Sequence, residues 1–441
     1  MKLGLLATSG IRVQNEDLLR AGLTLPGLVR RGELIASLPS LGLLTLAGLT
    51  PPEIDLEYVD VPEPREFRVD SAGYDAVALS SFTARIKETY ELADRFRQVG
   101  TKVILGGLHV SALPDEAAAH ADAVVTGEGE VTWPRLVGDL LRGDLQARYD
   151  SGTASYDLAD APMPRFDLLD PEAYSRLTVQ TQRGCPFRCS FCAASITIAP
   201  TFKTKPVAKV IAEIRRIKEI WPKPFLEFAD DNTFVDKRHA RKLMKALAEE
   251  DVRWFTESDV SIAGDPELLR LMRDSGCRQV LIGFESTSLS GLDGVELRSN
   301  WKAKQLGGYR RAIATIQEQG ITVNGCFVLG LDGTGKESFD DVLDFVESTG
   351  LYEVQLTVQT AFPGTPLEDR LRRSGRLLAE DAWELCTLFD VNYVPERMSA
   401  SELETSFREL IEEIYEEDAV RRRRETYIER LRELVAPERD E

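Results

Sequence analysis

Cys185, Cys189 and Cys192 form the spacing C-x3-C-x2-C, directly after an apolar segment with the composition of a β-strand. Three thiolates can hold a four-iron cluster at three corners, and a cluster needs a ligand on each iron to be fully closed. A motif with only three thiolates therefore leaves one iron for another ligand. The spacing predicts an iron–sulfur cluster with one open coordination position.

A structural zinc site is the alternative that these thiols allow. Such sites pair two C-x2-C units, or one C-x2-C with an H-x3-5-H pair, and the sequence contains no second unit. The other cysteines and the histidines each stand alone, at Cys277, Cys326, Cys386, His109, His120 and His239. A closed zinc site is therefore poorly supplied with ligands.

The run from Arg183 to Cys192 resembles the signature of the radical SAM superfamily, C-x3-C-x-aromatic-C, with Phe191 at the aromatic position. The resemblance implies that S-adenosylmethionine (SAM) binds the open iron of a [4Fe-4S] cluster through its amino and carboxylate groups. An electron from the cluster then breaks the C5′–S bond, and the 5′-deoxyadenosyl radical takes a hydrogen atom from the substrate. The resemblance also implies an electron donor such as flavodoxin or ferredoxin, while the protein positions and shields the reactants.

The composition narrows the class of partner. The chain has 54 basic and 73 acidic residues and a net charge of −19, which argues against a nucleic-acid partner held through phosphates. No run approaches the ~18 apolar residues of a membrane span, and the N-terminal apolar run is too short for a signal peptide. We expect a cytoplasmic protein, a compartment that suits reduced thiols and an oxygen-sensitive cluster.

Residues 1–145 alternate short apolar runs with helical stretches, which is typical of a parallel, Rossmann-like sheet with crossover helices. A helix is expected over residues 85–99, where apolar residues recur at helical spacing before Gly100. The expected strands cover residues 2–7, 54–59, 76–80, 103–105 and 123–125.

The glycine-rich turns of this region, residues 106–109 and 127–130, resemble those of the cobalamin-binding-type domain that precedes many radical SAM cores. The best-known cobalamin domains supply an axial histidine from an Asp-x-His-x-x-Gly motif, and this sequence has no such motif. Two interpretations stay open: cobalamin binds without a protein histidine, or the domain keeps the shape and has lost the cofactor.

Residues 146–176 are polar and proline-containing, and we interpret them as a linker. Residues 177–370 then contain six β-prone runs separated by helices, which predicts a partial (β/α)6 barrel, and residues 371–441 form a C-terminal helical region. In (β/α) barrels the chemistry lies at the carboxyl ends of the strands. The expected strands cover residues 178–183, 225–229, 252–257, 279–285, 321–329 and 353–361.

Unusual residues gather at those strand ends. The resemblance implies that a carboxylate after the second strand, Asp230 or Asp231, holds the SAM amino group, as suits a cationic ammonium. It implies SAM ribose contacts after the fourth strand and backbone platforms for adenine at the fifth and sixth. The residues expected to bind the cofactor are Phe191, Asp230, Asp231, Glu257, Ser258, Glu285, Ser286, Leu329 and Phe362.

Side chains alternate along a strand, so one row of each barrel strand faces the lumen. The predicted lumen row contains polar residues, and buried polar groups cost a few kcal/mol each unless they are satisfied. The pattern predicts a small polar substrate, hydroxylated or amino-sugar-like. The candidate catalytic residues are Glu227, Glu257, Asn324, Gln355 and Gln359.

Three functions remain in competition. The first is a biosynthetic radical SAM enzyme that abstracts hydrogen for dehydration, epimerisation or a related rearrangement, which the missing axial histidine and the polar lumen favour. The second is a cobalamin-dependent radical SAM methyltransferase. The third is a non-catalytic metal-binding scaffold, which predicts no cleavage of SAM.

Overall fold

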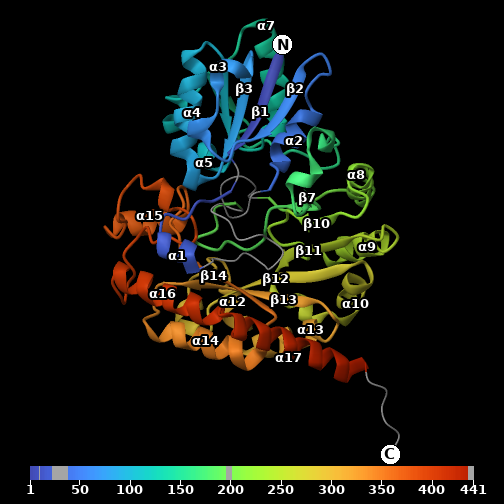
Figure 1. The fold of residues 1–441 in the computed structure, drawn as a ribbon, viewed down its shortest axis with the longest axis vertical. Helices are drawn as coiled ribbons and strands as arrows, with labels where there is room; N and C mark the ends of the chain where they lie inside the picture. Colours follow the sequence, from blue (N-terminus) through green and yellow to red (C-terminus); the bar gives the residue numbers. More distant parts are fainter. Residues whose placement is uncertain (9, 22–37, 195–200, 436–441) are drawn as a thin grey trace, which may run out of the picture.

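The structure is a computed structural model that describes residues 1–8, 10–21, 38–194 and 201–435. Its described part contains two six-stranded parallel sheets and one short antiparallel hairpin. In Figure 1 the N-terminal sheet (blue) lies at the top, and the second sheet follows below it, from β7 (green) to β14 (orange). The fold therefore combines the Rossmann-like sheet and the partial barrel that the sequence predicts.

The N-terminal sheet has the order β2-β1-β3-β4-β5-β6, with every neighbouring pair parallel. Five of its strands lie where the sequence predicts them. Four of these are apolar runs with mostly buried residues, whereas the strand at the sheet edge, residues 55–60, contains no fully buried residue. The sixth strand falls within the residues expected to form the linker. The strands are β1 (Lys2–Thr8), β2 (Asp55–Asp60), β3 (Ala76–Ser81), β4 (Lys102–Gly106), β5 (Ala123–Thr126) and β6 (Arg148–Asp150).

Helices cover both faces of this sheet, and each face has its own apolar core. One core joins Leu3 and Leu5 to Trp133, and the other joins Leu6 and Leu79 to Phe96. The helices of this part of the chain are α1 (Glu16–Ala21), α2 (Leu41–Gly48), α3 (Val69–Ala72), α4 (Ile86–Gln98), α5 (Leu108–Ala112), α6 (Pro114–Ala118) and α7 (Gly129–Arg142).

The second sheet has the order β14-β13-β12-β11-β10-β7 and is also wholly parallel. The strand expected over residues 178–183 is interrupted: β7 ends at Val179, and β8 pairs with β9 in an antiparallel hairpin instead. The strands are β7 (Leu177–Val179), β8 (Gln182–Arg183), β9 (Lys203–Thr204), β10 (Phe225–Phe228), β11 (Arg253–Ser258), β12 (Cys277–Glu285), β13 (Thr322–Leu329) and β14 (Glu353–Val358).

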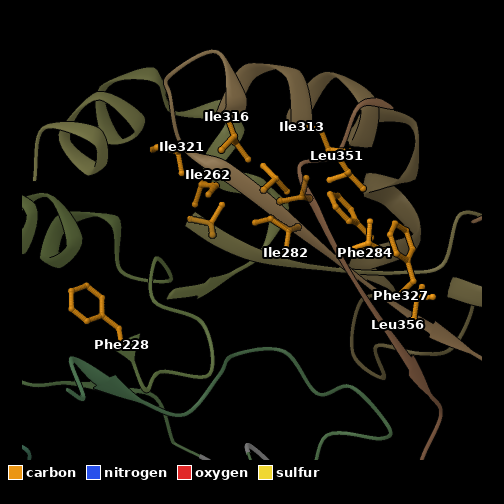
Figure 2. Packing of buried hydrophobic residues seen from close by; sticks show 14 of the residues in the cluster. Phe228, Ile262, Ile282, Phe284, Ile313, Ile316, Ile321, Phe327, Leu351 and Leu356 are labelled. Atoms are coloured by element: carbon orange, nitrogen blue, oxygen red, sulfur yellow. The ribbon is translucent and has the colours of Figure 1, made fainter. Parts of the chain in front are cut away.

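Amphipathic helices pack on the outer face of the second sheet. Figure 2 shows Ile313 and Ile316 of α13 pointing toward Ile282 and Phe284 of β12, and each fully buried side chain of this kind contributes about 1.5–3 kcal/mol. The helices are α8 (Val207–Ile220), α9 (Lys237–Leu247), α10 (Pro266–Asp274), α11 (Leu289–Leu292), α12 (Trp301–Gln305), α13 (Tyr309–Gln317), α14 (Glu337–Thr349) and α15 (Pro366–Arg373).

The C-terminal region ends in α16 (Ala400–Ile414) and α17 (Glu417–Val435), which run along the lower side of the barrel in Figure 1. A capping box of Ser399 and Glu402 begins α16. Upstream, Trp383 packs against the N-terminal domain: its indole Nε1 donates to Glu116 Oε2 at 3.1 Å. None of the helices in the described ranges combines the length and the apolar character that a membrane crossing requires.

Candidate functional site

One cavity at the carboxyl ends of the barrel strands, here called the barrel cavity, brings the three clustered cysteines together. Cys185, Cys189 and Cys192 all line it, as does Phe191. Residues of β11, β12, β13 and β14 form much of its wall, and residues after β10 and from α12 also line it. Residues distant in the sequence therefore face the thiols, as the barrel prediction requires.

The cysteine loop is residues 184–202, and the backbone of its described part is fixed by segments on the far side of the barrel. The Ser190 N–H donates to the Val295 carbonyl at 2.8 Å, and the Leu367 N–H donates to the Ser190 carbonyl at 3.0 Å. Glu296, which is 2% exposed, accepts from the Arg188 N–H of the loop at 3.4 Å and is itself held by the N–H groups of Arg298 and Ser299. These bonds preorganise the three cysteines.

Burial raises the pKa values of two of these thiols. Desolvation raises the pKa of Cys185 to about 11 and that of Cys189 to about 12. A metal binds the thiolate form of cysteine, so binding of iron to these cysteines releases their protons. The bound iron cations then stabilise the negative charge of the thiolates. Three thiols in one cavity fit a cluster that is held at three corners.

Of the residues expected to bind SAM, six line the barrel cavity: Phe191, Asp231, Glu257, Ser258, Glu285 and Phe362. Asp231 Oδ2 accepts from the Gly184 N–H at 3.0 Å, directly beside Cys185. Burial raises the pKa of Asp231, while the Gly184 N–H and Arg183 oppose that shift. A carboxylate at this place offers a partner to a cationic ligand.

Three of the expected cofactor residues lie outside the cavity lining. Asp230 is buried and accepts from the Thr181 N–H at 2.7 Å and the Gln182 N–H at 3.0 Å. It therefore fixes the turn that interrupts the first barrel strand. Ser286 is buried, with its Oγ 3.3 Å from that of Ser288, and Leu329 belongs to the apolar core.

The candidate catalytic residues divide in a similar way. Glu257, Gln355 and Gln359 line the barrel cavity, whereas Glu227 pairs with Arg176 and Asn324 is fully buried outside the lining. The structure thus brings three of the five candidates to the cysteines.

Glu257 is the most perturbed acid of the cavity. Its side chain is exposed to the cavity but lies deep in the barrel, so desolvation raises its pKa to about 8. The nearby charges of Glu227, Asp231 and Glu285 raise that pKa further. A carboxyl with such a pKa can accept or donate a proton near neutral pH.

Sequence reasoning missed Lys302, which also lines the cavity. Its Nζ donates to Glu285 Oε1 at 2.6 Å and to the Gly283 carbonyl at 2.8 Å. Burial lowers the pKa of Lys302, but Glu285 and Cys189 outweigh burial and hold it above its ordinary value. Lys302 is the one lysine among the cavity-lining residues, and it presents a permanent positive charge beside the thiols.

The backbone at Glu285 has an unusual conformation. Its φ is 65°, at a register shift between β12 and β13, and a non-glycine residue held there costs of order 1–3 kcal/mol. The sequence predicts Glu285 but gives no sign of its pair with Lys302, because two residues 17 positions apart form no local pattern. Trp301 was missed too; its ring stacks on Phe187 of the cysteine loop with centroids 4.7 Å apart.

A second cavity, here called the N-terminal cavity, lies at the carboxyl ends of β3, β4 and β5. Glycines line it at the two predicted turns, and two of them have positive φ: Gly107 at 111° and Gly127 at 73°. A Cβ on Gly127 would lie 2.1 Å from Ser151 Oγ, and the positive φ also favours glycine at this position. The remaining wall is mostly apolar, with Leu43, Leu46 and Val125 among its residues.

The glycine-lined, apolar wall gives room for a large planar cofactor to approach the backbone closely. No histidine belongs to the lining of this cavity within the described ranges. His109 follows β4 but is buried, with Nε2 3.1 Å from Glu116 Oε1 and its ring edge-on to Trp383. The residues present fit a corrinoid that takes no axial ligand from a histidine of this lining.

Family profiles match three parts of the chain. The profile described as "Radical SAM superfamily" matches residues 179–346, and the "B12 binding domain" matches residues 30–137. A "Domain of unknown function (DUF4070)" matches residues 365–440. The first two matches contain the barrel cavity's cysteines and the glycine turns of the N-terminal cavity, respectively.

Named relatives extend over most of the chain. Bacteriochlorophyllide d C-12(1)-methyltransferase of Chlorobaculum tepidum is 29% identical over 393 residues, which cover 87% of this chain and 84% of that protein. Hopanoid C-2 methylase of Rhodopseudomonas palustris is 28% identical over 359 residues, covering 79% and 67%. The radical S-adenosylmethionine methyltransferase TsrM of Kitasatospora setae, solved with cobalamin and a [4Fe-4S] cluster, has the same fold. Its TM-score is 0.63 at 15% identity, over 99% of this chain and 89% of that chain.

Proposed function

The chain belongs to the radical SAM superfamily, in the group with an N-terminal B12-binding domain, and on this premise we propose that it is a cobalamin-dependent methyltransferase. The sequence alone favours dehydration or epimerisation over this function. The relatives reverse that order, because proteins named as methyltransferases match both domains together. The single observation that carries the proposal is a glycine-lined N-terminal cavity in the same chain as a three-cysteine barrel cavity.

In this proposal Cys185, Cys189 and Cys192 hold the cluster, and Asp231 and Lys302 orient the charged amino-acid part of SAM. When bound, the cluster with SAM supplies a radical that removes a hydrogen atom from the substrate, and the corrinoid supplies the methyl group. The opposite charges of Asp231 and Lys302 suit an ammonium and a carboxylate, respectively. The apolar rings of Phe191 and Phe362 also line the barrel cavity, where they exclude water from the bound reactants.

We propose a substrate with hydrogen-bonding groups. Gln355, Thr357 and Gln359 line the barrel cavity along one face of β14 and its end. The Oε1 atoms of Gln355 and Gln359 are buried without a protein partner, and such atoms cost free energy unless a ligand or water satisfies them. Hydroxylated or amine-bearing molecules satisfy them and an unfunctionalised hydrocarbon does not.

We place the enzyme in the cytoplasm, with a flavodoxin or ferredoxin as its electron donor. All six cysteines have free thiols, the state that a reducing compartment maintains. The net charge of −19 argues against a polyanionic partner such as nucleic acid.

The test is anaerobic purification from cells supplied with cobalamin, followed by cluster reconstitution. A methyltransferase will hold a corrinoid, visible by its absorbance, and will transfer a deuterated methyl group from SAM to substrate. Ser80→Trp, which fills the N-terminal cavity, should remove the corrinoid and leave the cluster intact. Cleavage of SAM to 5′-deoxyadenosine by wild-type protein that takes up no corrinoid would favour the rearrangement chemistry instead.

A further inference from the structure

Both ends of the cysteine loop meet a single carboxylate of the N-terminal domain. The hairpin of β8 and β9 closes the loop, with Arg183 opposite Lys203. Arg183 Nη1 donates to Glu128 Oε1 at 2.7 Å, and Lys203 Nζ lies 2.6 Å from each Glu128 oxygen. Arg183 stands two residues before Cys185, so the contact is immediately next to the proposed cluster ligands.

Glu128 itself belongs to the N-terminal cavity. It follows Gly127 at the end of β5 and lines that cavity together with Arg183. The Tyr156 N–H donates to its Oε2 at 2.9 Å, and Ser151 Oγ accepts from the Glu128 N–H at 3.2 Å. The carboxylate is thus oriented by its own domain before it meets the loop.

The network is buried and balanced in charge. Arg183 Nη2 also donates to Glu130 Oε1 at 2.6 Å, which gives two carboxylates and two cations. The side chains of Glu128 and Lys203 are only 7% and 15% exposed. Burial raises the pKa of Glu128, but Lys203, the Tyr156 N–H and Arg183 outweigh it and lower that pKa, so the carboxylate is ionised at neutral pH.

We propose that Glu128 is a positioning residue that fixes the cysteine loop relative to the N-terminal cavity, so that groups bound at the two sites keep a constant separation. It acts through Arg183 and Lys203 and touches no reacting atom. The inference rests on the proposed function, because only a chain that holds both a cluster and a corrinoid needs this separation. A methyl group and a substrate radical must meet at short range, and small displacements of reacting groups slow such steps strongly.

Stabilisation alone is the competing explanation, and the barrel offers a matched control. Lys205 pairs with Glu213 at 2.8 Å, and their side chains are 5% and 2% exposed. This pair lies two residues beyond Lys203 but joins only parts of the barrel. Glu213→Gln therefore breaks an equally buried glutamate–lysine contact without loosening the loop from the N-terminal domain.

The experiment measures the distance between the two proposed cofactors in the holoenzyme. The protein is loaded with a cluster and with cob(II)alamin, the cluster is reduced, and pulsed electron paramagnetic resonance records their dipolar coupling. We expect Glu128→Gln to broaden the distance distribution and Glu213→Gln to leave it as in wild type. Glu128→Asp, which keeps the charge but is shorter, should give an intermediate width. An unchanged distribution in Glu128→Gln overturns the proposal.

A second measurement does not depend on the corrinoid. Hydrogen–deuterium exchange of the cofactor-free protein should rise at Cys185–Cys192 in Glu128→Gln and stay at the wild-type level there in Glu213→Gln. Equal exchange in the two variants also overturns the proposal. A further outcome is that the two variants differ in exchange as expected while wild-type protein binds no corrinoid. That result would contradict the proposed function and leave the positioning role of Glu128 in place.

Discussion

The Nζ atom of Lys302 lies 2.6 Å from Oε1 of Glu285, and both side chains are close to buried, at 12% and 9% exposure. Glu285 reaches this position from a backbone with positive φ. The pair joins the end of β12 to α12 at the edge of the barrel cavity. A buried ion pair is expensive to break, because removal of one partner leaves the other charge uncompensated.

Lys302→Met tests this pair. It should lower the free energy of unfolding by about 3–5 kcal/mol, since it leaves Glu285 buried without its cation. If Lys302 also holds the SAM carboxylate, the variant will bind SAM more weakly than its loss of stability explains. Urea denaturation and equilibrium dialysis with SAM measure the two effects.

Lys336→Met is the control for Lys302. Lys336 Nζ lies 2.9 Å from Glu402 Oε1, but the two side chains are 60% and 45% exposed. An exposed pair contributes about 0–1 kcal/mol, so this variant should resemble wild type in both measurements. Equal effects of the two substitutions would show that the burial of the Lys302–Glu285 pair has no energetic consequence.

Cys189→Ala should remove both the cluster and the cleavage of SAM, because a cluster with two thiolate ligands is not retained. Iron analysis and the yield of 5′-deoxyadenosine check the two losses. Cys277→Ala is the matched substitution: Cys277 is 1% exposed, sits in the barrel's apolar core and is absent from the cavity lining. It should keep its iron. SAM cleavage that survives in Cys189→Ala would contradict the assignment of the three cysteines.

The sequence predicted most strands of the N-terminal sheet from their apolar runs, because burial on both faces of a parallel sheet requires apolar side chains at successive positions. β2 was predicted too, although it has no fully buried residue. The sequence did not predict β6, where only Tyr149 of three residues is buried. It also joined β7 and β8 into one strand. The break between them depends on Asp230, which lies about fifty residues further on and accepts from the Thr181 and Gln182 N–H groups.

The sequence predicted part of the candidate site as well, namely the residues that belong to local motifs. Short-range spacing predicted the cysteines, since all three lie close together in the sequence. The resemblance of the segment after the second barrel strand to radical SAM proteins indicated Asp231. Lys302 and Glu128 were not recognised, because their partners are Glu285 and Arg183, which are distant in the chain. A long-range ion pair has no local pattern, so only the folded structure displays it.

Glu257 makes stability depend on pH. Its pKa rises from 4.5 to about 8 on folding, so the folded protein keeps a proton that the unfolded chain has already lost. The contribution of this neutral carboxyl is fully present below about pH 4.5 and is lost as the pH rises through 8. Relative to Glu257→Gln, wild type should therefore melt at progressively lower temperature across that interval.

Differential scanning calorimetry at several pH values measures this dependence. Glu249→Gln, a substitution of an exposed glutamate after α9, should leave the slope of melting temperature against pH as in wild type. If the Glu257→Gln and wild-type curves stay parallel across the interval, the carboxyl is already ionised in the folded protein and the argument for a proton-exchanging residue fails.

Asn324, a candidate catalytic residue that lies outside the barrel cavity's lining, can be tested without knowledge of the substrate. It is fully buried on β13, and neither its Oδ1 nor its Nδ2 has a partner among the protein atoms described. Since an unsatisfied buried polar group costs about 1–3 kcal/mol, Asn324→Leu should raise the free energy of unfolding, as measured in urea. If Asn324 meets the substrate, this gain in stability will come with lost turnover, because polar groups kept at a cost in stability are typical of functional sites.

Asn392 provides the opposite case. Its Oδ1 accepts from the Ala361 N–H at 3.1 Å, and its Nδ2 donates to the Ala361 carbonyl at 3.2 Å. Asn392→Leu breaks satisfied bonds and leaves the Ala361 N–H unpaired, so it should destabilise the protein by about 1–3 kcal/mol. The two asparagines should thus respond with opposite signs to the same substitution. A loss of stability in Asn324→Leu as large as that in Asn392→Leu would show that Asn324 serves the fold rather than a ligand.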